Sequence, residues 1–338
     1  MITLKDIAKE CGVSFSTVSK ALKSSSEIGA DTIKIVQNKA LEMGYHPNLA
    51  ARTLRTNRTY DIGVIFEDQT GSGLQHQYFA TIFSSLQLAA MSKGFEITFM
   101  GSANSSKFDY YAHCKYRGFD GVAILATKFN RPDIQKLIKS DIPTITLDFI
   151  TDNSHSAVMS DNNAGIESLL EYIISMGHRR IAIIHGEKTL VTEERVEAFG
   201  KITKRYGLTI PDSFILSGIY HDPVTSSEAT EILMGLPSPP TCIMYPDDFA
   251  ALGGIRVLNK HNMIIGRDIS ITGYDGIMLT SMLTPPLTTY RQDGELIGKL
   301  LAEHLIGEIE NGESFQPRHS SVCGKLIRGA SVASIQRS

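Results

Sequence analysis

Short apolar runs alternate with amphipathic segments from Tyr60 onward, and this alternation is the feature that most limits the possible folds. The runs have the length of single strands, whereas the amphipathic segments repeat their apolar residues at helical spacing. Repeated strand–helix units form parallel sheets with helices on both faces. The predicted strands are residues 62–66, 97–100, 121–125, 144–147, 181–184, 242–245 and 269–272, and the predicted helices are residues 80–92, 164–176, 194–205 and 250–259.

Two of the runs, residues 63–66 and 181–184, look like the first strands of two similar lobes. In such a pair of lobes a small molecule binds in a cleft at the carboxyl ends of the strands. The contents of 42% hydrophobic and 20% charged residues are those of an ordinary globular protein. The body of the chain therefore predicts a two-lobed α/β domain with a binding cleft.

The N-terminal part follows a different, all-helical pattern. A capping-box pattern begins at Thr3, and apolar residues then recur at helical spacing until Gly12, which is expected to end the helix. Ser14 can cap a second helix over residues 15–23, and a third helix is predicted over residues 31–43. Two short helices joined by a tight turn, the second with an uncharged polar face at its start, match a helix-turn-helix.

Charge is divided unevenly along the chain. Residues 1–60 hold nine Lys or Arg against five acids, which leaves 24 basic against 31 acidic residues in the remainder. A basic head on an acidic body predicts a polyanionic partner for the head alone. The four cysteines are far apart in the sequence, which favours free thiols in a reducing cytoplasm. The sequence also shows no signal peptide and no long apolar run. A cytoplasmic protein without membrane insertion is therefore expected.

Between head and body, residues 46–58 carry three arginines and no acid. Asn48 could cap a helix here, but the segment is short, since isolated helices need roughly 12–15 residues to be even marginally stable. Leu54 lies among the arginines with no obvious core to join. The segment is either a tether that folds against a polyanion, with the leucine as a wedge, or a solvated linker between domains.

Three common catalytic motifs are missing from the sequence: Gly-x-Ser-x-Gly, His-Glu-x-x-His and the phosphate-binding loop. Asp248 is expected to cap the helix that follows it rather than to act as an acid or base. The pair Gly253-Gly254 falls inside a helical pattern. The sequence therefore predicts a binding protein, not an enzyme, with no cofactor and no metal site.

Several motifs together resemble the lac-repressor/galactose-repressor (LacI) family of transcription regulators. They are Ile7-Ala8, Gly12-Val13-Ser14-x-x-Thr17-Val18-Ser19, Met43-Gly44-Tyr45-His46-Pro47-Asn48, Gly177-His178-Arg179-Arg180-Ile181, Gly273-Tyr274-Asp275 and Pro286-Leu287-Thr288-Thr289-Tyr290-Arg291-Gln292. Their order and spacing cover nearly the whole chain. The resemblance implies an N-terminal all-α helix-turn-helix domain followed by a two-lobed, periplasmic-binding-protein-like α/β effector domain with doubly wound parallel sheets.

The domain boundaries implied by this resemblance are a helix-turn-helix domain over residues 1–46, a hinge helix or linker over 47–59, and an effector-binding and dimerisation domain over 60–338. The N-lobe of this last domain would span about 61–160 and 291–321, and the C-lobe about 161–290 and 322–330. Three crossovers near residues 160, 290 and 322 would join the lobes. Gly29 stands where the family usually has a serine cap, at an expected cost of a few tenths of a kcal/mol.

DNA contacts are also implied by the resemblance. Phe15, Ser16 and Lys20 match readers of the major groove, and Thr17 matches a contact to phosphate and base. Leu54 matches the leucine that opens the central base step together with its dimer mate. Phe15 could instead be a packing residue, and Ser14 a cap without a phosphate contact. The predicted DNA-binding residues are Thr3, Leu4, Ser14, Phe15, Ser16, Thr17, Ser19, Lys20, Tyr45, Asn48, Ala51, Leu54 and Arg55.

For the cleft, Arg195 matches a family arginine whose planar donors suit the paired acceptors of a sugar or a purine. Asp148 and Asp275 follow predicted strands, so each could accept ligand hydroxyls or simply stabilise a turn. Because the chain has no Trp, the candidate stacking platforms are Tyr or Phe, and Phe79 could equally belong to the core. The predicted effector-binding residues are Tyr78, Phe79, Asp148, Arg195, Tyr220, Asp247, Asp275 and Gln292.

One departure from the family concerns Asp247, which stands where an asparagine is common. An ionised carboxylate only accepts hydrogen bonds, so a ligand richer in donors is favoured, such as a hydroxyl-bearing sugar or an amine.

The implied function is a ligand-responsive repressor of carbohydrate-use genes that binds a pseudo-palindromic operator in double-stranded DNA as a homodimer. A small effector, most simply a sugar or sugar derivative, would change hinge folding and DNA affinity from the cleft. Two alternatives are a sugar-binding transport protein, against which the missing signal peptide and basic head count, and a regulator controlled by a protein co-regulator on the N-lobe.

Overall fold

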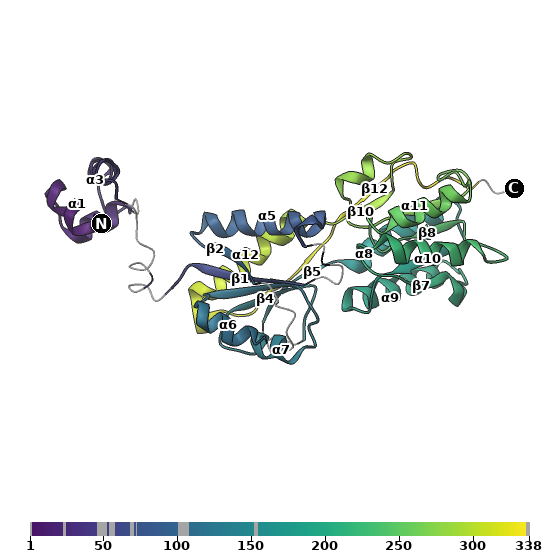
Figure 1. Cartoon of the computed structure of the whole chain (residues 1–338), viewed down its shortest axis with the longest axis horizontal. Coiled ribbons are helices and arrows are strands. Elements are labelled where there is room, and N and C mark those ends of the chain that lie inside the picture. The colour runs from purple at the N-terminus through teal and green to yellow at the C-terminus, as the bar shows by residue number, and fades with distance from the viewer. Residues whose placement is uncertain are drawn as a thin grey trace. The chain divides into compact units, whose positions relative to one another are not determined.

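The computed structural model describes residues 2–22, 25–45, 53, 58–67, 71, 73–100, 108–151 and 155–335 (Figure 1). Its internal contacts divide the chain into two compact units, Met1–Thr59 and Tyr60–Ser338. No helix among the described residues is both long enough and apolar enough to cross a bilayer.

The first unit contains three helices, α1 (Leu4–Cys11), α2 (Phe15–Ala21) and α3 (Ala30–Glu42). Thr3 and Asp6 form the expected capping box, and Gly12 ends α1 with a φ of 64°, a conformation that glycine adopts without strain. The core is made by one apolar stripe from each helix, Ile7, Val18, Ala21, Val36 and Ala40. The predicted helix-turn-helix fold is confirmed, and α3 begins without a side-chain cap at Gly29.

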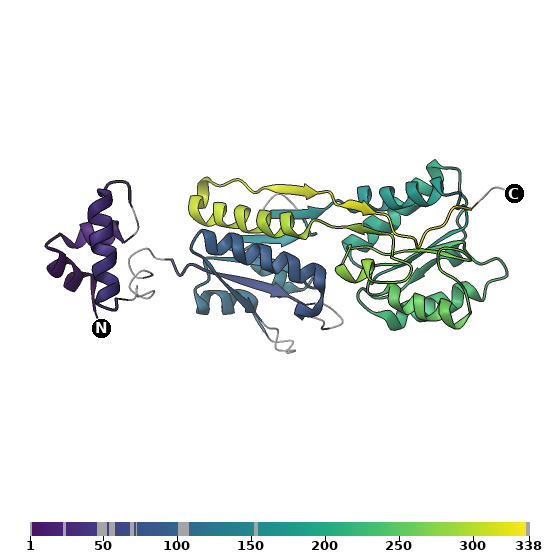
Figure 2. The same ribbon diagram turned by 90° about the horizontal axis from the view of Figure 1, so that it is seen from above.

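The N-lobe of the second unit contains a parallel sheet whose strands follow the order β11-β5-β4-β3-β1-β2. These strands are β1 (Asp61–Phe66), β2 (Glu96–Met100), β3 (Gly121–Ala126), β4 (Thr144–Leu147), β5 (Ser156–Ser160) and β11 (His319–Val322). Helices α5 (Gln77–Ser92) and α12 (Gly294–Asn311) lie side by side on one face (Figure 2), and α6 (Tyr110–Arg117) and α7 (Pro132–Ile138) cover the other.

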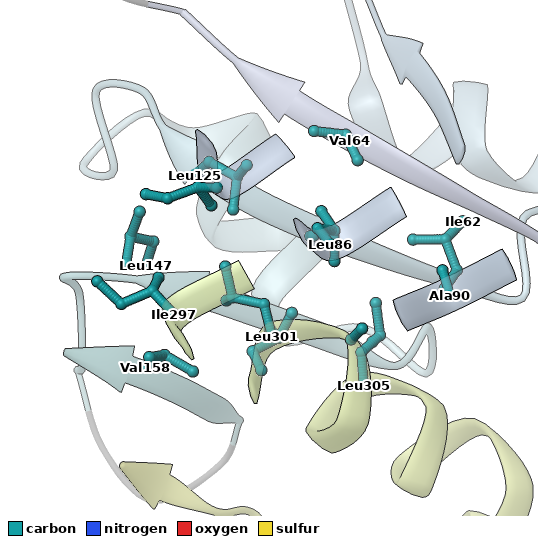
Figure 3. Packing of buried hydrophobic residues seen from close by; sticks show 14 of the residues in the cluster. Ile62, Val64, Leu86, Ala90, Leu125, Leu147, Val158, Ile297, Leu301 and Leu305 are labelled. Carbon is teal, nitrogen blue, oxygen red and sulfur yellow. The ribbon is translucent and has the colours of Figure 1, made fainter. Parts of the chain in front are cut away.

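The packing on the first face shows why this sheet is parallel and buried (Figure 3). Leu86 and Ala90 of α5 and Leu301 of α12 point toward the strands, where Val64 and Leu125 meet them. Each of these side chains is at most 2% exposed. Strands with both faces covered need continuous rather than alternating apolar sequence, which is the pattern of these runs.

The C-lobe repeats this plan with a smaller parallel sheet in the order β7-β6-β8-β9. Its strands are β6 (Ile181–His185), β7 (Ile215–Ser217), β8 (Cys242–Met244) and β9 (Ser270–Thr272). Helices α8 (Asn162–Ser175) and α9 (Leu190–Arg205) cover one face, and α10 (Pro223–Met234) and α11 (Ala251–Lys260) cover the other. The predicted fold class, parallel sheets wound by helices, is confirmed for both lobes.

The chain passes between the lobes at three places. β5 runs into α8, β10 (Thr289–Arg291) runs into α12, and β11 runs into β12 (Lys325–Ile327). β10 and β12 pair antiparallel with each other, so two of the three connections are joined by backbone hydrogen bonds. The loops at the carboxyl ends of β4, β8 and β9 open toward this junction and carry the polar residues of the site.

Candidate functional site

The first candidate site is the exposed start of α2 in the helix-turn-helix unit. Ser14 caps the helix, because its Oγ accepts the backbone N–H of Thr17 at 3.1 Å and lies 2.8 Å from the hydroxyl of Ser16. Phe15 is 48% exposed and does not belong to the three-helix core, so its alternative role as a packing residue is wrong. An exposed aromatic ring flanked by hydroxyls provides an apolar contact for a thymine methyl group together with hydrogen bonds for base edges.

The other predicted DNA-binding residues of this unit have more mixed surroundings. Lys20 is exposed and forms an ion pair with Glu27. Leu4 and Tyr45 are partly buried against the core, so each has a packing role as well. Thr3 is exposed while serving as the α1 cap, and Ser19 is half-buried on α2. The predicted contacts Asn48, Ala51, Leu54 and Arg55 lie outside the described residues.

The second candidate site lies at the junction of the two lobes, and its N-lobe side is formed by the start of α5 at Tyr78 and by the loop after β4 at Asp148. Tyr78 is in the first turn of α5, and its hydroxyl lies 3.3 Å from Ser160 Oγ. Asp148 follows β4 in the left-handed region, with a φ of 53°. Its carboxylate accepts the backbone N–H of Ser160 at 2.5 Å and the Ser160 hydroxyl at 3.1 Å. The end of β5 therefore holds this carboxylate in place.

The C-lobe side is organised around Arg195, which is 7% exposed and comes from α9. Its Nε donates to Asn162 Oδ1 at 2.8 Å, and one Nη donates to the Pro246 carbonyl at 3.1 Å. The guanidinium carbon lies 3.6 Å from the centre of the Tyr274 ring, a close cation–π contact. Burial acts to lower the pKa of Arg195, but neighbouring tyrosines and carboxylates raise it overall, so the group keeps its charge.

Two further carboxylates, Asp275 and Asp247, lie in the loops after β9 and β8. Asp275 has a φ of 98° and accepts a hydrogen bond from Gln292 Nε2 at 2.7 Å. Asp247 accepts the N–H of His221 at 2.6 Å and that of Ala250 at 2.7 Å. Both Asp148 and Asp275 thus have positive φ values, which for residues other than glycine cost of order 1–3 kcal/mol each.

Burial dominates the titration of these acids. It raises the pKa of Asp148 from 3.8 to about 6, and hydrogen bonds from Ser160 oppose the rise. Burial also raises the pKa of Asp247 and of Asp275, and the charge of Asp275 adds to the rise at Asp247. Since burial favours the neutral form of a carboxyl, a cation or a set of hydroxyl donors would be needed to stabilise all three charges together.

Asp248 differs from its prediction. It does not cap α11, because its two oxygens accept the Thr289 hydroxyl at 2.6 Å and the Ile277 N–H at 2.9 Å. The preceding residue, Asp247, reaches the amide of Ala250 instead. Asp248 thus ties the loop after β9 to β10, and so acts as an internal support of the crossover rather than as a helix cap.

Among the predicted platforms, Tyr220 and Phe79 have different environments. Tyr220 OH lies 3.0 Å from Thr192 Oγ1, and its ring covers Gly186, where an added Cβ would come within 2.2 Å of it. Only glycine therefore allows this position of the ring. Phe79 packs on Phe66 at 4.6 Å between ring centroids and against the N-lobe core, which supports its alternative role in packing.

An aromatic stack across the junction was not predicted from the sequence. His76, immediately before α5, stacks on His221 of the C-lobe with ring centroids 4.3 Å apart, and His221 stacks on Phe249 at 4.1 Å. A hydrogen bond from the Met278 N–H to Gln77 Oε1, 3.1 Å long, also joins the lobes. Single histidines in separate loops carry no spacing signal, so only the folded chain brings them together.

The two lobes touch through the His76–His221 stack and the Met278–Gln77 hydrogen bond, and a hollow of about 480 Å³ lined by Gln77, Met278 and Arg291 lies beside these contacts. The void lined by Arg195, Tyr220 and Tyr274 measures about 10 Å³, close to the smallest space that holds one water molecule. In the part of the chain that is described, no group of three or more His, Cys, Asp or Glu side chains is placed to bind a metal ion. The polar groups of the junction, one arginine and three carboxyl groups, are of the kinds that hydrogen-bond polar organic ligands.

A helix-turn-helix unit on a two-lobed α/β body, with buried polar residues between the lobes, defines the class of ligand-responsive DNA-binding proteins. The family model "Bacterial regulatory proteins, lacI family" matches residues 3–48, and the model "Periplasmic binding protein-like domain" matches residues 170–332. The chain therefore combines a LacI-family helix-turn-helix domain with a periplasmic-binding-protein-like domain, the domain composition of LacI-family transcriptional regulators.

Relatives match over almost the full length. The chain is 29% identical to "Probable HTH-type transcriptional repressor ExuR" of Bacillus subtilis (strain 168), over 93% of both chains. Its fold matches that of the lac repressor dimer bound to operator and the anti-inducer ONPF, with a TM-score of 0.79 at 21% identity over 98% of this chain and 99% of that one. It also matches a transcriptional regulator CelR–cellobiose complex, with a TM-score of 0.73 at 23% identity over 98% and 100% of the chains.

Proposed function

We propose that this protein is a transcriptional repressor that binds a pseudo-palindromic operator as a homodimer and responds to a small polar ligand held between its lobes. One observation carries the proposal: Arg195, Asp148 and Asp275, which lie far apart in the sequence, are held together at the junction of the lobes in a chain that also has a helix-turn-helix unit. Names of relatives, which include repressors and sugar complexes, support the same function.

On the DNA side, the exposed face of α2 would enter the major groove, with Phe15 and Ser16 at base edges. Two copies related by a twofold axis would read half-sites about 34 Å apart, or one helical turn. The segment 47–59, most of which lies outside the described residues, would then meet its mate in the minor groove between the half-sites, with Leu54 as the wedge.

Exposed apolar side chains support the homodimer. On the N-lobe, Leu88 and Met91 of α5 are 66% and 51% exposed, and Phe99 of β2 is 48% exposed. On the C-lobe, Val224 and Ile232 of α10 are 59% and 57% exposed. Apolar groups on both lobes suit a second copy of the same chain, which would cover both at once.

Ligand binding would act on DNA through the N-lobes. A change in lobe closure would alter the spacing of the two N-lobes in the dimer and so allow or prevent the paired folding of the two 47–59 segments. Moving the DNA-bound fraction from 99:1 to 1:99 needs about 5.5 kcal/mol of differential affinity, which two sites of a few kcal/mol each could supply.

The experiment is a selection of duplexes from a random library by the full chain, followed by affinity measurements with and without small molecules. Phe15→Ala should weaken binding to the selected duplex by about 10- to 100-fold, in line with loss of one base contact of 1–3 kcal/mol. Leu41→Ala is the matched control, since Leu41 is an 82% exposed apolar residue of the same unit on α3.

Each outcome separates one alternative. A sugar-binding transport protein would select no duplex. A regulator controlled by a protein would select a duplex but show no change of affinity with any small molecule. Equal losses of affinity for the selected duplex in Phe15→Ala and Leu41→Ala would contradict a role of α2 in recognising DNA sequence.

A further inference from the structure

The charged groups of the interlobe site are mostly acidic. Asp148 comes from the N-lobe and Asp247 and Asp275 from the C-lobe, and the charges of Asp148 and Asp275 act directly on Arg195. Arg195 thus faces carboxyl groups from both lobes, while His76 acts on Asp247 and His221 on Asp275. An anionic ligand would disfavour ionisation of these acids further, whereas a cationic ligand would favour it.

Arg195 is also largely committed to the protein. It donates to Asn162 and to the Pro246 carbonyl, and its flat face lies on Tyr274. A bidentate grip on a ligand carboxylate or phosphate uses two parallel N–H groups of the guanidinium fork, and two of the five N–H groups are already engaged. The Nε side of the fork is thus closed by Asn162, and the three remaining N–H groups of Arg195 can donate to ligand hydroxyls.

The aspartates retain unused accepting capacity. An ionised carboxylate offers about four acceptor sites. Asp275 takes its hydrogen bond from Gln292 through Oδ1, and Asp247 takes one backbone N–H on each oxygen. Hydroxyl and ammonium groups of a ligand can therefore donate to both side chains without displacing these bonds.

Flat aromatic surfaces at the same junction give an independent indication of a cation. His221 stacks on Phe249, and the Tyr220 ring lies 5.6 Å from the Arg195 guanidinium carbon, so the ring already accepts a cation near its face. Aromatic faces combined with carboxylates are the surroundings in which proteins bind organic ammonium groups, because the ring quadrupole and the carboxylate charge both attract them.

We propose that the interlobe site selects an amine-bearing polyol, a small hydroxylated ring that carries a protonated amino group, over the corresponding neutral sugar and sugar acid. The hydroxyls donate to Asp148, and the ammonium group lies between Asp247 and Asp275. This inference rests on the proposed function, because it names the ligand class of the same site.

The test compares matched sugars by thermal shift and calorimetry on the full chain at pH 7.5. The sets are glucose, glucosamine and glucuronate, and the same three forms in the galactose and mannose series. At least one amine should bind about tenfold or more tightly than its neutral and acidic counterparts, a difference of about 1.4 kcal/mol. An acid that binds more tightly than its amine, or the absence of binding by every amine, overturns the proposal.

Variants test the residues assigned. Asp247→Asn and Asp275→Asn should each lower the affinity for the amine about tenfold or more while changing that for the neutral sugar far less. Asp212→Asn, on the exposed surface of the C-lobe, should change neither. Equal losses for amine and neutral sugar in the site variants would show a structural role and overturn the assignment. A neutral or acidic sugar that alters DNA affinity would overturn the charge preference but leave the proposed function in place.

Discussion

Replacement of Asp148 by asparagine should stabilise the folded protein at neutral pH. The wild-type carboxylate must be charged in surroundings that favour its neutral form, since burial raises its pKa from 3.8 to about 6. Asparagine has nearly the same shape. Its oxygen can still accept the Ser160 N–H, and its amide can donate to the Ser160 hydroxyl, so both contacts of Asp148 have a substitute.

The magnitude follows from the shift of about two pKa units, which corresponds to roughly 3 kcal/mol as an upper value. Because the folded pKa lies above the unfolded one, this stability is complete below about pH 4 and is lost as the pH rises through about 6. The asparagine variant does not titrate. Its advantage over wild type should therefore be near zero at pH 4 and grow to about 2–3 kcal/mol at pH 7.5.

Urea unfolding of wild type and Asp148→Asn at several pH values between 4 and 8 measures this difference directly. Buried acids that do not interact with Asp148 contribute equally to both proteins, so the difference reports on Asp148 and its direct neighbours. Asp212→Asn serves as the exposed control and should follow wild type at every pH. A constant difference between Asp148→Asn and wild type across this pH range would refute the burial argument for the site.

Three further changes test other parts of the structure. Gly186→Ala should displace Tyr220, lower the unfolding free energy by about 1–3 kcal/mol and abolish ligand binding in calorimetry; unchanged binding would exclude Tyr220 from the site. Arg195→Met leaves buried carboxylates without their cation, so we expect a loss of about 3–5 kcal/mol in urea unfolding and no ligand effect on DNA affinity, and a surviving ligand effect would contradict the assignment. Leu54→Ala should weaken the selected duplex more than random DNA in anisotropy titrations, and equal weakening would argue against a wedge.

The seven predicted strands could be placed to within one residue at each end, because each is a short apolar run. β4 was predicted at residues 144–147 and lies there, and β1 begins one residue earlier than predicted. The strands that were not predicted are β5, β7, β10, β11 and β12. β5 and β11, with the sequences SAVMS and HSSV, contain polar residues, and they gain their place by pairing, β5 with both β4 and β11. Short strands of this kind have no local signal that distinguishes them from loops.

Helix starts were less predictable than strands. α5 begins at Gln77, three residues before the predicted start, and His76 makes no side-chain cap that the sequence could reveal. α9 begins at Leu190 rather than at residue 194, because Thr189 caps it through the N–H of Thr192. Caps formed by residues outside the apolar stripe are the reason that periodicity alone misplaces such boundaries.

Some residues of the site could be recognised from local sequence motifs, whereas others become neighbours only in the folded chain. Arg195 and Asp275 stand in recognisable motifs, and the structure brings them together. The stack of His76 on His221 depends on loops more than 140 positions apart, and the swap of roles between Asp247 and Asp248 depends on where β10 lies. The stack could not be inferred before the lobes were placed against each other, and the roles of Asp247 and Asp248 could not be inferred before β10 was placed.

The most direct measurement is the affinity of the full chain for its selected duplex, by fluorescence anisotropy, with and without a saturating compound that binds the interlobe site. We expect the two affinities to differ by about tenfold or more, which corresponds to a coupling of about 1.4 kcal/mol between the sites. Equal affinities with the compound bound would contradict control of DNA binding by a ligand between the lobes.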